Sequence, residues 1–217
     1  MQDTTIIDTL QPLLTDERRE RIDAVVRARN YGLTVVLENL HDDGNLSAIL
    51  RTCDAMGIQR INVALEDGQS FKSERNISLG AHKWLDIRVW PGTAPCLEDL
   101  RKDGYRIVAT HLEASVPLEA IDFSQKVAVV FGNEKLGVSD EVVRLCDERV
   151  HLPMTGFVQS LNVSVAAGIA LYHAINTRRA ARGAEGDLTD AQLDALRARF
   201  YRRSVRSADL LLQELAE

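Results

Sequence analysis

The sequence is short of cysteine, of long apolar runs and of positive charge. Its three cysteines, Cys53, Cys96 and Cys146, stand far apart without CxxC or Cys/His spacing. This pattern predicts neither a disulfide framework nor a zinc site or other metal centre. No apolar run approaches the roughly 20 residues of a membrane helix, and no basic segment followed by an apolar one opens the chain. We therefore expect a soluble protein of the cytoplasm without a membrane partner.

Common nucleotide-binding and nucleophile signatures are also missing. The GxGxxG dinucleotide fingerprint is absent. Residues 132–137 imitate the glycine spacing of a Walker phosphate loop, but Val138 stands where that motif needs lysine, which disfavours ATP chemistry. The five histidines form no pattern with Ser160, so a Ser/His/Asp triad is unsupported.

The net charge of −6 excludes a uniformly basic nucleic-acid binder but leaves room for a local basic face. Residues 178–206 carry a net positive charge, because their eight arginines outnumber their four acidic residues. These arginines are Arg178, Arg179, Arg182, Arg197, Arg199, Arg202, Arg203 and Arg206. Arg197 and Arg199 beside Asp194 fit a solvated helix with salt bridges. The run at 202–206 favours bidentate contacts with phosphates.

Short β-branched runs alternate with helical patterns from Leu33 onward. Strands are expected at 33–39, 61–65, 106–112, 127–132 and 149–153. Helices are expected at 45–56, at 96–104, from Ser139 onward, and from about 158 to 178. This alternation predicts an α/β fold with a mainly parallel sheet flanked by helices.

Helical extensions are expected at both ends of the chain. Thr15 is a suitable cap for an N-terminal helix, and Thr189 with Gln192 forms a capping box before a C-terminal one. Residues 178–187 have the composition of a flexible linker. We therefore divide the chain into an N-terminal extension (1–32), an α/β domain (33–178) and a C-terminal extension (179–217).

The first candidate motif is HDDGNLSAILRTCDAMG, residues 41–57. Apolar side chains at helical spacing must face the core, namely those of Leu46, Ile49, Leu50 and Cys53. Ser47, Arg51 and Asp54 are then left on the outer face. Asn45 can cap this helix and also line the end of the preceding strand, where sites in α/β sheets gather. The alternative is a solvent-exposed Arg51 paired with Asp54.

The second motif is FGNEKLGVS, residues 131–139, a glycine-bounded loop after a buried strand. Such a loop can cradle a nucleoside, although Glu134 and Lys135 can equally form an ordinary surface pair. The third motif is LPMTGFVQSLNVSVAAG, residues 152–168, in which Ser160, Asn162 and Ser164 crowd the start of a helix. Its small residues allow close packing of another helix. The alternative is an ordinary helix with a polar N-terminus.

Taken in this order, the three motifs resemble those of the SPOUT superfamily of RNA methyltransferases. The likeness covers about residues 33–174 and is greatest to the branch that methylates the ribose 2′-hydroxyl of the D-loop guanosine in tRNA. The resemblance implies a parallel α/β sheet with a C-terminal deep trefoil knot, S-adenosylmethionine bound in that knot, and a homodimer. It also implies that residues 33–178 form the catalytic domain and that the two extensions bind tRNA.

The resemblance further implies which residues form the site. The cofactor would lie against Thr110, His111, Gly132, Leu152, Met154 and Leu161. His111 departs from the small or apolar residue that is expected at its position. Catalytic roles would fall to Asn45, Arg51, Glu134, Ser160 and Asn162. RNA contacts would come from Arg18, Arg19, Arg178, Arg202, Arg203 and Arg206.

The family arginine that matches Arg51 is held to activate the ribose hydroxyl. Because a guanidinium is a poor proton acceptor, we favour electrostatic stabilisation of the developing alkoxide or clamping of a phosphate, and the base role stays open. The expected reaction is 2′-O-methylation of guanosine 18 in tRNA. The alternatives are the same reaction on 23S rRNA or at another tRNA position, and a non-catalytic knotted RNA-binding protein.

Overall fold

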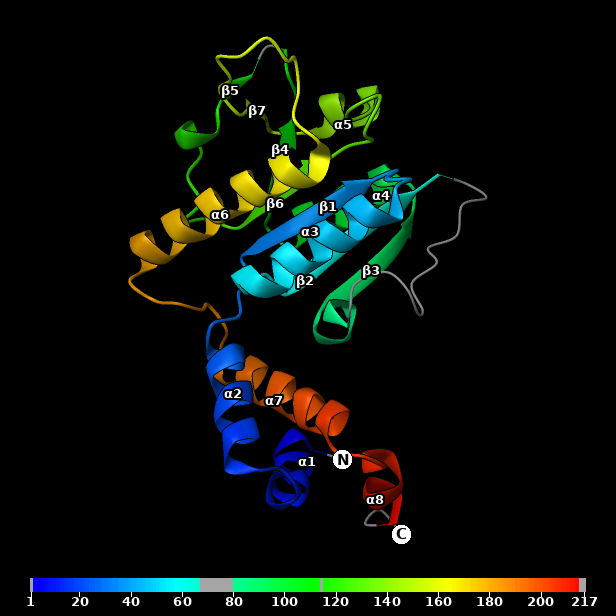
Figure 1. Cartoon of the computed structure of the whole chain (residues 1–217), viewed down its shortest axis with the longest axis vertical. Coiled ribbons are helices and arrows are strands. Elements are labelled where there is room, and N and C mark those ends of the chain that lie inside the picture. Colours follow the sequence, from blue (N-terminus) through cyan, green and yellow to red (C-terminus); the bar gives the residue numbers. More distant parts are fainter. Residues whose placement is uncertain (1, 67–79, 114, 215–217) are drawn as a thin grey trace. The chain divides into compact units, whose positions relative to one another are not determined.

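The computed structural model describes residues 2–66, 80–113 and 115–214, which form two compact units (Figure 1). One unit comprises residues 31–184, and the other joins residues 1–30 to residues 185–217. Among the residues that the structure describes, none of the helices combines the length and apolarity needed to cross a bilayer.

The larger unit is built on a parallel sheet. Its strand order is β3-β2-β1-β6-β4-β7-β5, and every pair of neighbours runs parallel. The strands are β1 (Leu33–Glu38), β2 (Arg60–Leu65), β3 (Asp86–Pro91), β4 (Arg106–Thr110), β5 (Val116–Pro117), β6 (Val127–Phe131) and β7 (Glu148–His151). The predicted mainly parallel α/β fold is therefore confirmed. The central strand β1 is buried along its whole length, as expected for a sheet with both faces covered.

Helices cover both faces of this sheet. α3 (Asp43–Met56) and α6 (Val163–Arg182) pack with one core, to which β1 contributes Val35 and Leu37. α4 (Thr93–Lys102) and α5 (Asp140–Leu145) pack with the other, to which β1 contributes Val36. The short 3-10 helices η2 (Ala81–Trp84) and η3 (Leu118–Ala120) complete the unit. Alternate residues of β1 thus serve opposite cores.

The predicted inner face of α3 is confirmed, but its predicted cap is wrong. Leu46, Ile49, Leu50 and Cys53 are all buried. The cap is Asp42, whose Oδ1 accepts a hydrogen bond from the backbone N of Asn45 at 2.7 Å. The helix therefore begins earlier than expected, and the side chain of Asn45 is released from capping to make other contacts.

The long helix α6 also differs from its expected bounds. It starts at Val163 rather than near residue 158, because the Asn162 side chain accepts from the backbone N of Ser164 and Val165. It then continues through Arg182 to Gly183, whose φ of 64° ends the helix in a left-handed C-cap. The helix α6 therefore includes the first half of the predicted flexible linker. It also includes the predicted domain boundary at 178/179.

The smaller unit consists of helices from both ends of the chain. These are α1 (Asp3–Leu10), η1 (Gln11–Leu13), α2 (Asp16–Arg27), α7 (Asp190–Ser204) and α8 (Ala208–Glu214). Thr15 caps α2, and the Thr189/Gln192 capping box opens α7, both as predicted. Leu196 and Phe200 of α7 are buried with Val26 of α2. Gly186 lies against the end of α2, where a Cβ would come within 2.1 Å of the Arg27 carbonyl oxygen.

Candidate active site

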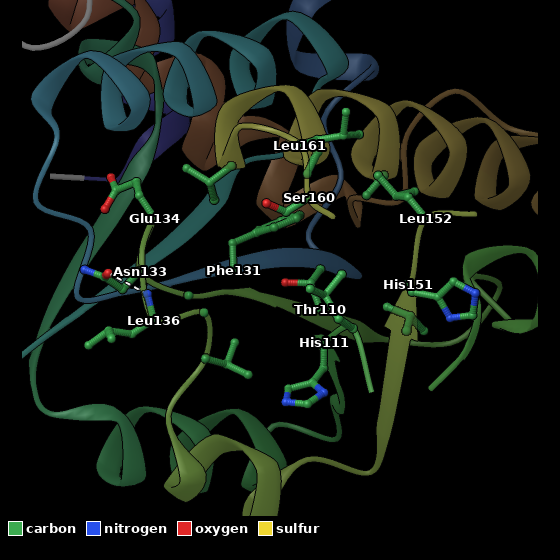
Figure 2. Close-up of a pocket in the computed structure, with 18 of the residues that line it drawn as sticks. Thr110, His111, Phe131, Asn133, Glu134, Leu136, His151, Leu152, Ser160 and Leu161 are labelled. Atoms are coloured by element: carbon green, nitrogen blue, oxygen red, sulfur yellow. Dashed lines mark hydrogen bonds between the residues drawn. The ribbon is translucent and has the colours of Figure 1, made fainter. Parts of the chain in front are cut away.

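A cavity of about 450 Å³ opens at the carboxyl ends of β4, β6 and β7, next to the start of α6 (Figure 2). This is the edge of a parallel sheet where ligands bind in α/β folds. In the view of Figure 2, Glu134 and Leu136 lie on one side of the cavity and His151 and Leu152 on the other. The predicted cofactor residues Thr110, His111, Gly132, Leu152, Met154 and Leu161 all line it.

The buried lining of the cavity, which we call its floor, is apolar, and its exposed rim carries polar groups beside Leu112 and Leu136. The floor is contributed by residues from several elements, namely Leu118, Phe131, Val150, Ala166 and Ala170. The rim includes Glu113, Glu134 and Ser160. An apolar surface with a few convergent polar groups is the usual composition of a small-molecule site.

Residues 132–139, which we call the cofactor loop, make a tight turn after β6. A Cβ at Gly132 would lie 2.2 Å from the carbonyl group of Gly137, so only glycine fits there. Gly137 itself has a φ of 72°, a left-handed conformation that also favours glycine. The Asn133 side chain fills the turn and accepts from the backbone N of Lys135 at 2.8 Å and of Leu136 at 3.1 Å. This turn directs Glu134 toward α3.

The three motifs meet in a chain of hydrogen bonds. Asn162, at the start of α6, donates from Nδ2 to Oδ1 of Asn45 at 3.0 Å. Asn45 in turn donates from Nδ2 to Oε1 of Glu134 at 3.3 Å, and the backbone N of Asp42 donates to the same oxygen at 3.2 Å. Three of the five predicted catalytic residues, which are up to 117 positions apart in sequence, are thus held side by side.

The carboxyl group of Glu134 is held in its ionised form. Partial burial raises its pKa, but hydrogen bonds from its own backbone N, from the Asn45 side chain and from the backbone of Asp42 and His41 outweigh that effect. The pKa therefore lies below the ordinary value of 4.5. At neutral pH this carboxylate accepts hydrogen bonds and so holds its donors in place. Its low pKa makes it a weak general base.

The remaining two predicted catalytic residues occupy different positions. Ser160 lines the cavity directly. Arg51 lies on the exposed face of α3, six positions after Asn45, or about 9 Å further along the helix axis. Within the described part of the chain its guanidinium makes no hydrogen bond or ion pair, so the alternative pairing with Asp54 is not formed. Arg51 is therefore available to an external anion.

Several residues that line the cavity were not among the predicted site residues. His151, at the end of β7, lines the cavity, and its Nδ1 lies 2.8 Å from Oγ of Ser115. Asn133 and Leu136 belong to the second motif, but they carry no reactive group that would single them out. Asparagine after a strand is a common turn residue, which is the one signal that could have identified the role of Asn133.

One predicted RNA contact is wrong. Arg178 is only 3% exposed, and its Nη1 donates to the carbonyl oxygens of Phe123, Ser124 and Gln125 at 2.9, 3.1 and 2.5 Å. Its position follows the buried stripe of α6, seven residues after Leu171 and three after Ile175. Arg178 is a structural residue that holds the loop before β6, and phosphates cannot reach it.

The other predicted RNA contacts lie in the smaller unit. Arg18, Arg202, Arg203 and Arg206 are exposed. Arg18 donates to Oγ of Ser204 at 3.2 Å, which places the start of α2 beside the end of α7. Arg19 pairs with Asp16 and Arg202 with Asp209. Arg197 is held between Asp23 and Asp194, as the salt-bridge alternative predicted.

Comparison with known proteins shows to which class this fold and cavity belong. Residues 32–172 match the SpoU rRNA Methylase family, so the chain belongs to that family. It is 43% identical over 165 residues to the tRNA (guanosine(18)-2′-O)-methyltransferase of Thermus thermophilus, across 76% of this chain and 84% of that protein.

Two solved structures are also similar. The TrmH/SpoU tRNA modifying enzyme of A. aeolicus superposes with a TM-score of 0.79 at 33% identity, covering 88% of this chain and 98% of that chain. The SpoU methyltransferase AviRb of Streptomyces viridochromogenes, in complex with the cofactor AdoMet, gives a TM-score of 0.62 at 29% identity. That match covers 69% of this chain and 59% of the other.

Proposed function

We propose that this protein transfers a methyl group from S-adenosylmethionine to the ribose 2′-hydroxyl of guanosine 18 in the D-loop of tRNA. The observation that carries the proposal is the meeting of Asn45, Glu134 and Asn162 beside the cavity at the strand ends. The names of the similar proteins support the reaction and the substrate.

The cavity suits S-adenosylmethionine in both size and lining. Its volume falls in the range typical of small-molecule sites. The apolar floor around Phe131 and Val150 fits a purine, and the rim offers polar groups for ribose hydroxyls and for an amino-acid moiety. When bound, this cofactor supplies an electrophilic methyl group carried on sulfur. We assign its contacts to Thr110, His111, Gly132, Leu152, Met154 and Leu161.

The protein's own contribution to the reaction is mainly positioning and charge. Methyl transfer needs the attacking oxygen in line with the methyl carbon, and fixed geometry alone lowers such barriers greatly. Asn45, Glu134 and Asn162 are already held by one another, and Ser160 extends this polar edge into the cavity. Arg51 stabilises the negative charge that develops on the 2′-oxygen, or holds the adjacent phosphate.

The basic cluster of the smaller unit is the proposed tRNA contact. It consists of Arg18, Arg19, Arg202, Arg203 and Arg206, from the start of α2 and from the end of α7 and the residues that follow it. Arginine suits phosphate because its guanidinium donates two parallel hydrogen bonds. The cluster gives an otherwise acidic chain one surface on which an RNA backbone is attracted.

We further propose that the protein is a homodimer whose subunits meet on α6, and that it works in the cytoplasm. Val165, Ile169 and Tyr172 form an apolar stripe at helical spacing, each between 48% and 60% exposed. Such a stripe on a helix indicates an unoccupied packing face. The three free cysteines agree with a reducing compartment.

The trefoil knot is likewise a proposal. It is supported by the position of β7 between β4 and β5 in the sheet. The chain after β7 also shares one cavity with the cofactor loop.

Transfer of labelled methyl to unmodified transcripts tests the function. Purified protein is incubated with S-adenosylmethionine and either tRNA or 23S rRNA, and the product is mapped by partial alkaline hydrolysis. A methylated 2′-oxygen cannot attack its own phosphate, so one band disappears from the ladder. We expect the missing band at guanosine 18 of tRNA. Label entering only rRNA, or another tRNA position, would overturn the proposed substrate.

A further inference from the structure

Two consecutive residues at the end of β1 hold the two ends of the cofactor loop. The carboxyl group of Glu38 is 2% exposed and accepts three hydrogen bonds. Two come from Ser139, from its backbone N at 2.8 Å and from its Oγ at 2.6 Å. The third comes from Oγ1 of Thr93 at 2.8 Å. The C-terminal end of the loop is thereby tied to β1 and to the start of α4.

The N-terminal end of the loop is tied to Asn39, the residue that follows Glu38. Nδ2 of Asn133 donates to the carbonyl oxygen of Asn39 at 2.9 Å. Asn39 has a φ of 50°, an uncommon left-handed conformation for a residue other than glycine. That conformation is held by Glu66, whose backbone N donates to the Asn39 side chain and whose carboxylate accepts from it, both at 3.0 Å.

The parallel register explains why this arrangement is possible. Leu37 of β1 is paired with Phe131 of β6, so Glu38 and Asn39 emerge directly beside the residues that begin the cofactor loop. Ser139 also accepts from the backbone N of Val142 and so caps α5. The same hydroxyl therefore links the end of the loop to Glu38 and to the following helix.

Burying a polar group is costly unless all its hydrogen bonds are made. Glu38 places a carboxyl group on the face of β1 that also carries the core residue Val36, where an apolar side chain would be buried without that cost. Two of its three bonds hold Ser139, directly after the cavity-lining Val138, and the third comes from Thr93 at the start of α4. Backbone strain of the kind found at the neighbouring Asn39 clusters near functional sites.

We propose that Glu38 and Asn133 are positioning residues that preorganise the cofactor loop, so that it binds S-adenosylmethionine and presents Glu134 to Asn45. The inference rests on the proposed function, because it concerns the cofactor of that reaction. Neither side chain reacts. Each fixes one end of a loop whose backbone forms the cavity wall.

The test compares four variants with the wild-type protein. In Glu38→Leu the size is kept and the acceptors are removed. In Glu38→Gln the geometry is kept. The amide oxygen still accepts from the backbone N of Ser139, and the hydroxyls of Ser139 and Thr93 can rotate to accept from the amide nitrogen. In Asn133→Ala the other end of the loop is released. The matched control is Thr34→Val, since Thr34 lies on the same face of β1, four residues before Glu38.

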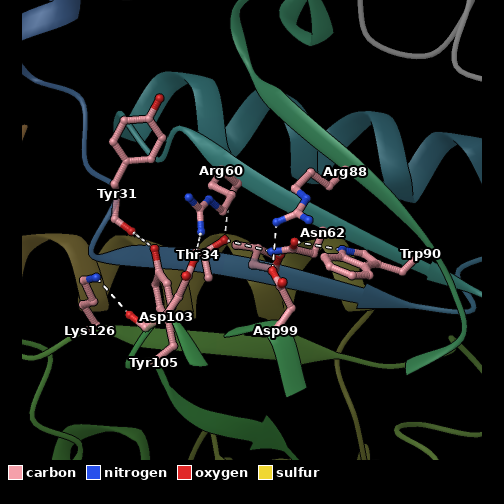
Figure 3. A network of polar contacts seen from close by, with 11 residues as sticks. Tyr31, Thr34, Arg60, Asn62, Arg88, Trp90, Asp99, Asp103, Tyr105 and Lys126 are labelled. Carbon is pink, nitrogen blue, oxygen red and sulfur yellow. Dashed lines mark hydrogen bonds and ion pairs between the residues drawn. The ribbon is translucent and has the colours of Figure 1, made fainter. Parts of the chain in front are cut away.

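Thr34 is as buried and as fully hydrogen-bonded as Glu38, but it belongs to a separate network (Figure 3). Its Oγ1 donates to the Arg60 carbonyl at 2.7 Å and accepts from Nδ2 of Asn62 at 3.1 Å. Asn62 in turn accepts from the Trp90 indole at 3.0 Å. Thr34 and the Arg60 carbonyl group lie at the amino ends of β1 and β2, away from the carboxyl end of β1 that holds the cofactor loop. Thr34→Val therefore measures the effect of destabilising β1 alone.

The readouts are the dissociation constant of S-adenosylmethionine by calorimetry, the kinetic constants and the thermal midpoint. We expect Glu38→Leu and Asn133→Ala to weaken cofactor binding at least about tenfold, the effect of about 1.4 kcal/mol. Their KM for the cofactor should rise more than their kcat falls. Glu38→Gln should stay within about threefold of wild type, as should Thr34→Val despite a lower thermal midpoint.

Wild-type cofactor affinity in both Glu38→Leu and Asn133→Ala would overturn the inference. So would a fall in affinity in Thr34→Val equal to that in Glu38→Leu, because the effect would then be one of general stability. If Glu38→Leu does not fold, Asn133→Ala decides the question, since that residue is only half-buried. Failure of the proposed function is distinguishable, because the wild-type protein itself would then bind no S-adenosylmethionine.

Discussion

At the scale of single residues, Asn45 and Arg51 share one helix but have opposite surroundings. Asn45 is fixed by Asn162 and Glu134, and its side chain adds rigidity to a site that is already assembled. Arg51 is exposed on the same helix and is left for a ligand. The first is suited to orient groups, and the second is suited to meet a charge that appears only during reaction.

Replacing Arg51 separates these roles. We expect Arg51→Ala to lower the rate of methyl transfer by about 10²-fold or more, as removal of a charge-stabilising donor does in other enzymes. Arg51→Lys should recover only part of the rate, because lysine lacks the planar two-donor fork. Affinity for tRNA, measured by filter binding, should change less than about threefold. Unchanged activity of Arg51→Ala would remove this residue from the mechanism.

Glu134 gives a prediction about pH. Its pKa is lower in the folded protein than in the unfolded chain, so the folded state binds its proton less readily. The resulting stabilisation is present above the unfolded pKa of about 4.5 and is lost as the pH falls through the folded value. In urea titrations at several pH values, the stability advantage of wild type over Glu134→Gln should therefore be larger at pH 7 than at pH 3. An advantage that grew on acidification would contradict this assignment.

At the scale of elements, the periodicity of apolar residues predicted most of the fold. The alternation of β-branched runs and helical stripes located five of the seven strands of the sheet and missed β3 and the two-residue β5. The structure confirms three predicted helix starts, at Thr15, at Ser139 and at the Thr189/Gln192 box. Errors in helix capping fell where a polar side chain had two possible uses. Asn45 has the pattern of a cap, but its side chain hydrogen-bonds with Glu134 and Asn162 instead. Asn162 has the pattern of a site residue and is also the cap of α6.

The pattern could not predict what depends on distant contacts. The burial of Arg178 follows from three carbonyl groups more than 50 positions away in the sequence. The restraint of the cofactor loop by Glu38 and Asn39 depends on the pairing of β1 with β6. The strand order of the sheet cannot be read from local periodicity, and it is this order that brings the three motifs to one edge.

The cofactor loop supplies a prediction at this scale. Gly132→Ala should weaken S-adenosylmethionine binding by about tenfold or more, because the new methyl group would overlap the backbone of Gly137 and Val138. Gly156→Ala is the matched control, since a Cβ there meets nothing within 4 Å. Calorimetry on both variants makes the comparison. Equal affinities of the two variants for S-adenosylmethionine would contradict this prediction, because the loop would then accommodate the added methyl group without disturbing the cavity.

At the scale of the whole molecule, a net acidic chain must bind an acidic polymer through the places where its arginines are exposed. The end of α7 and the segment after it, with Arg18 of α2, form one such place, and Arg178 does not belong to it. Charge and burial together therefore predict which arginines contact RNA, whereas the count of arginines alone does not.

Salt dependence tests this distinction. The double variant Arg203→Ala/Arg206→Ala should weaken tRNA binding and reduce the slope of log affinity against log salt by roughly one to two, because each arginine that neutralises a phosphate adds about one to that slope. Arg178→Ala should lower the thermal midpoint and leave the slope unchanged, because its guanidinium is buried among carbonyl groups. A reduced slope in Arg178→Ala with unaltered stability would contradict this division of the arginines.

The most direct test of the central claim uses two tRNA transcripts that differ by a single oxygen atom. One carries guanosine at position 18, and the other carries 2′-deoxyguanosine there. Transfer of labelled methyl from S-adenosylmethionine is then measured with the wild-type protein under identical conditions. The proposed function predicts one methyl group per guanosine-18 transcript and none on its deoxy counterpart, with both RNAs bound about equally. Equal labelling of the two transcripts would contradict it.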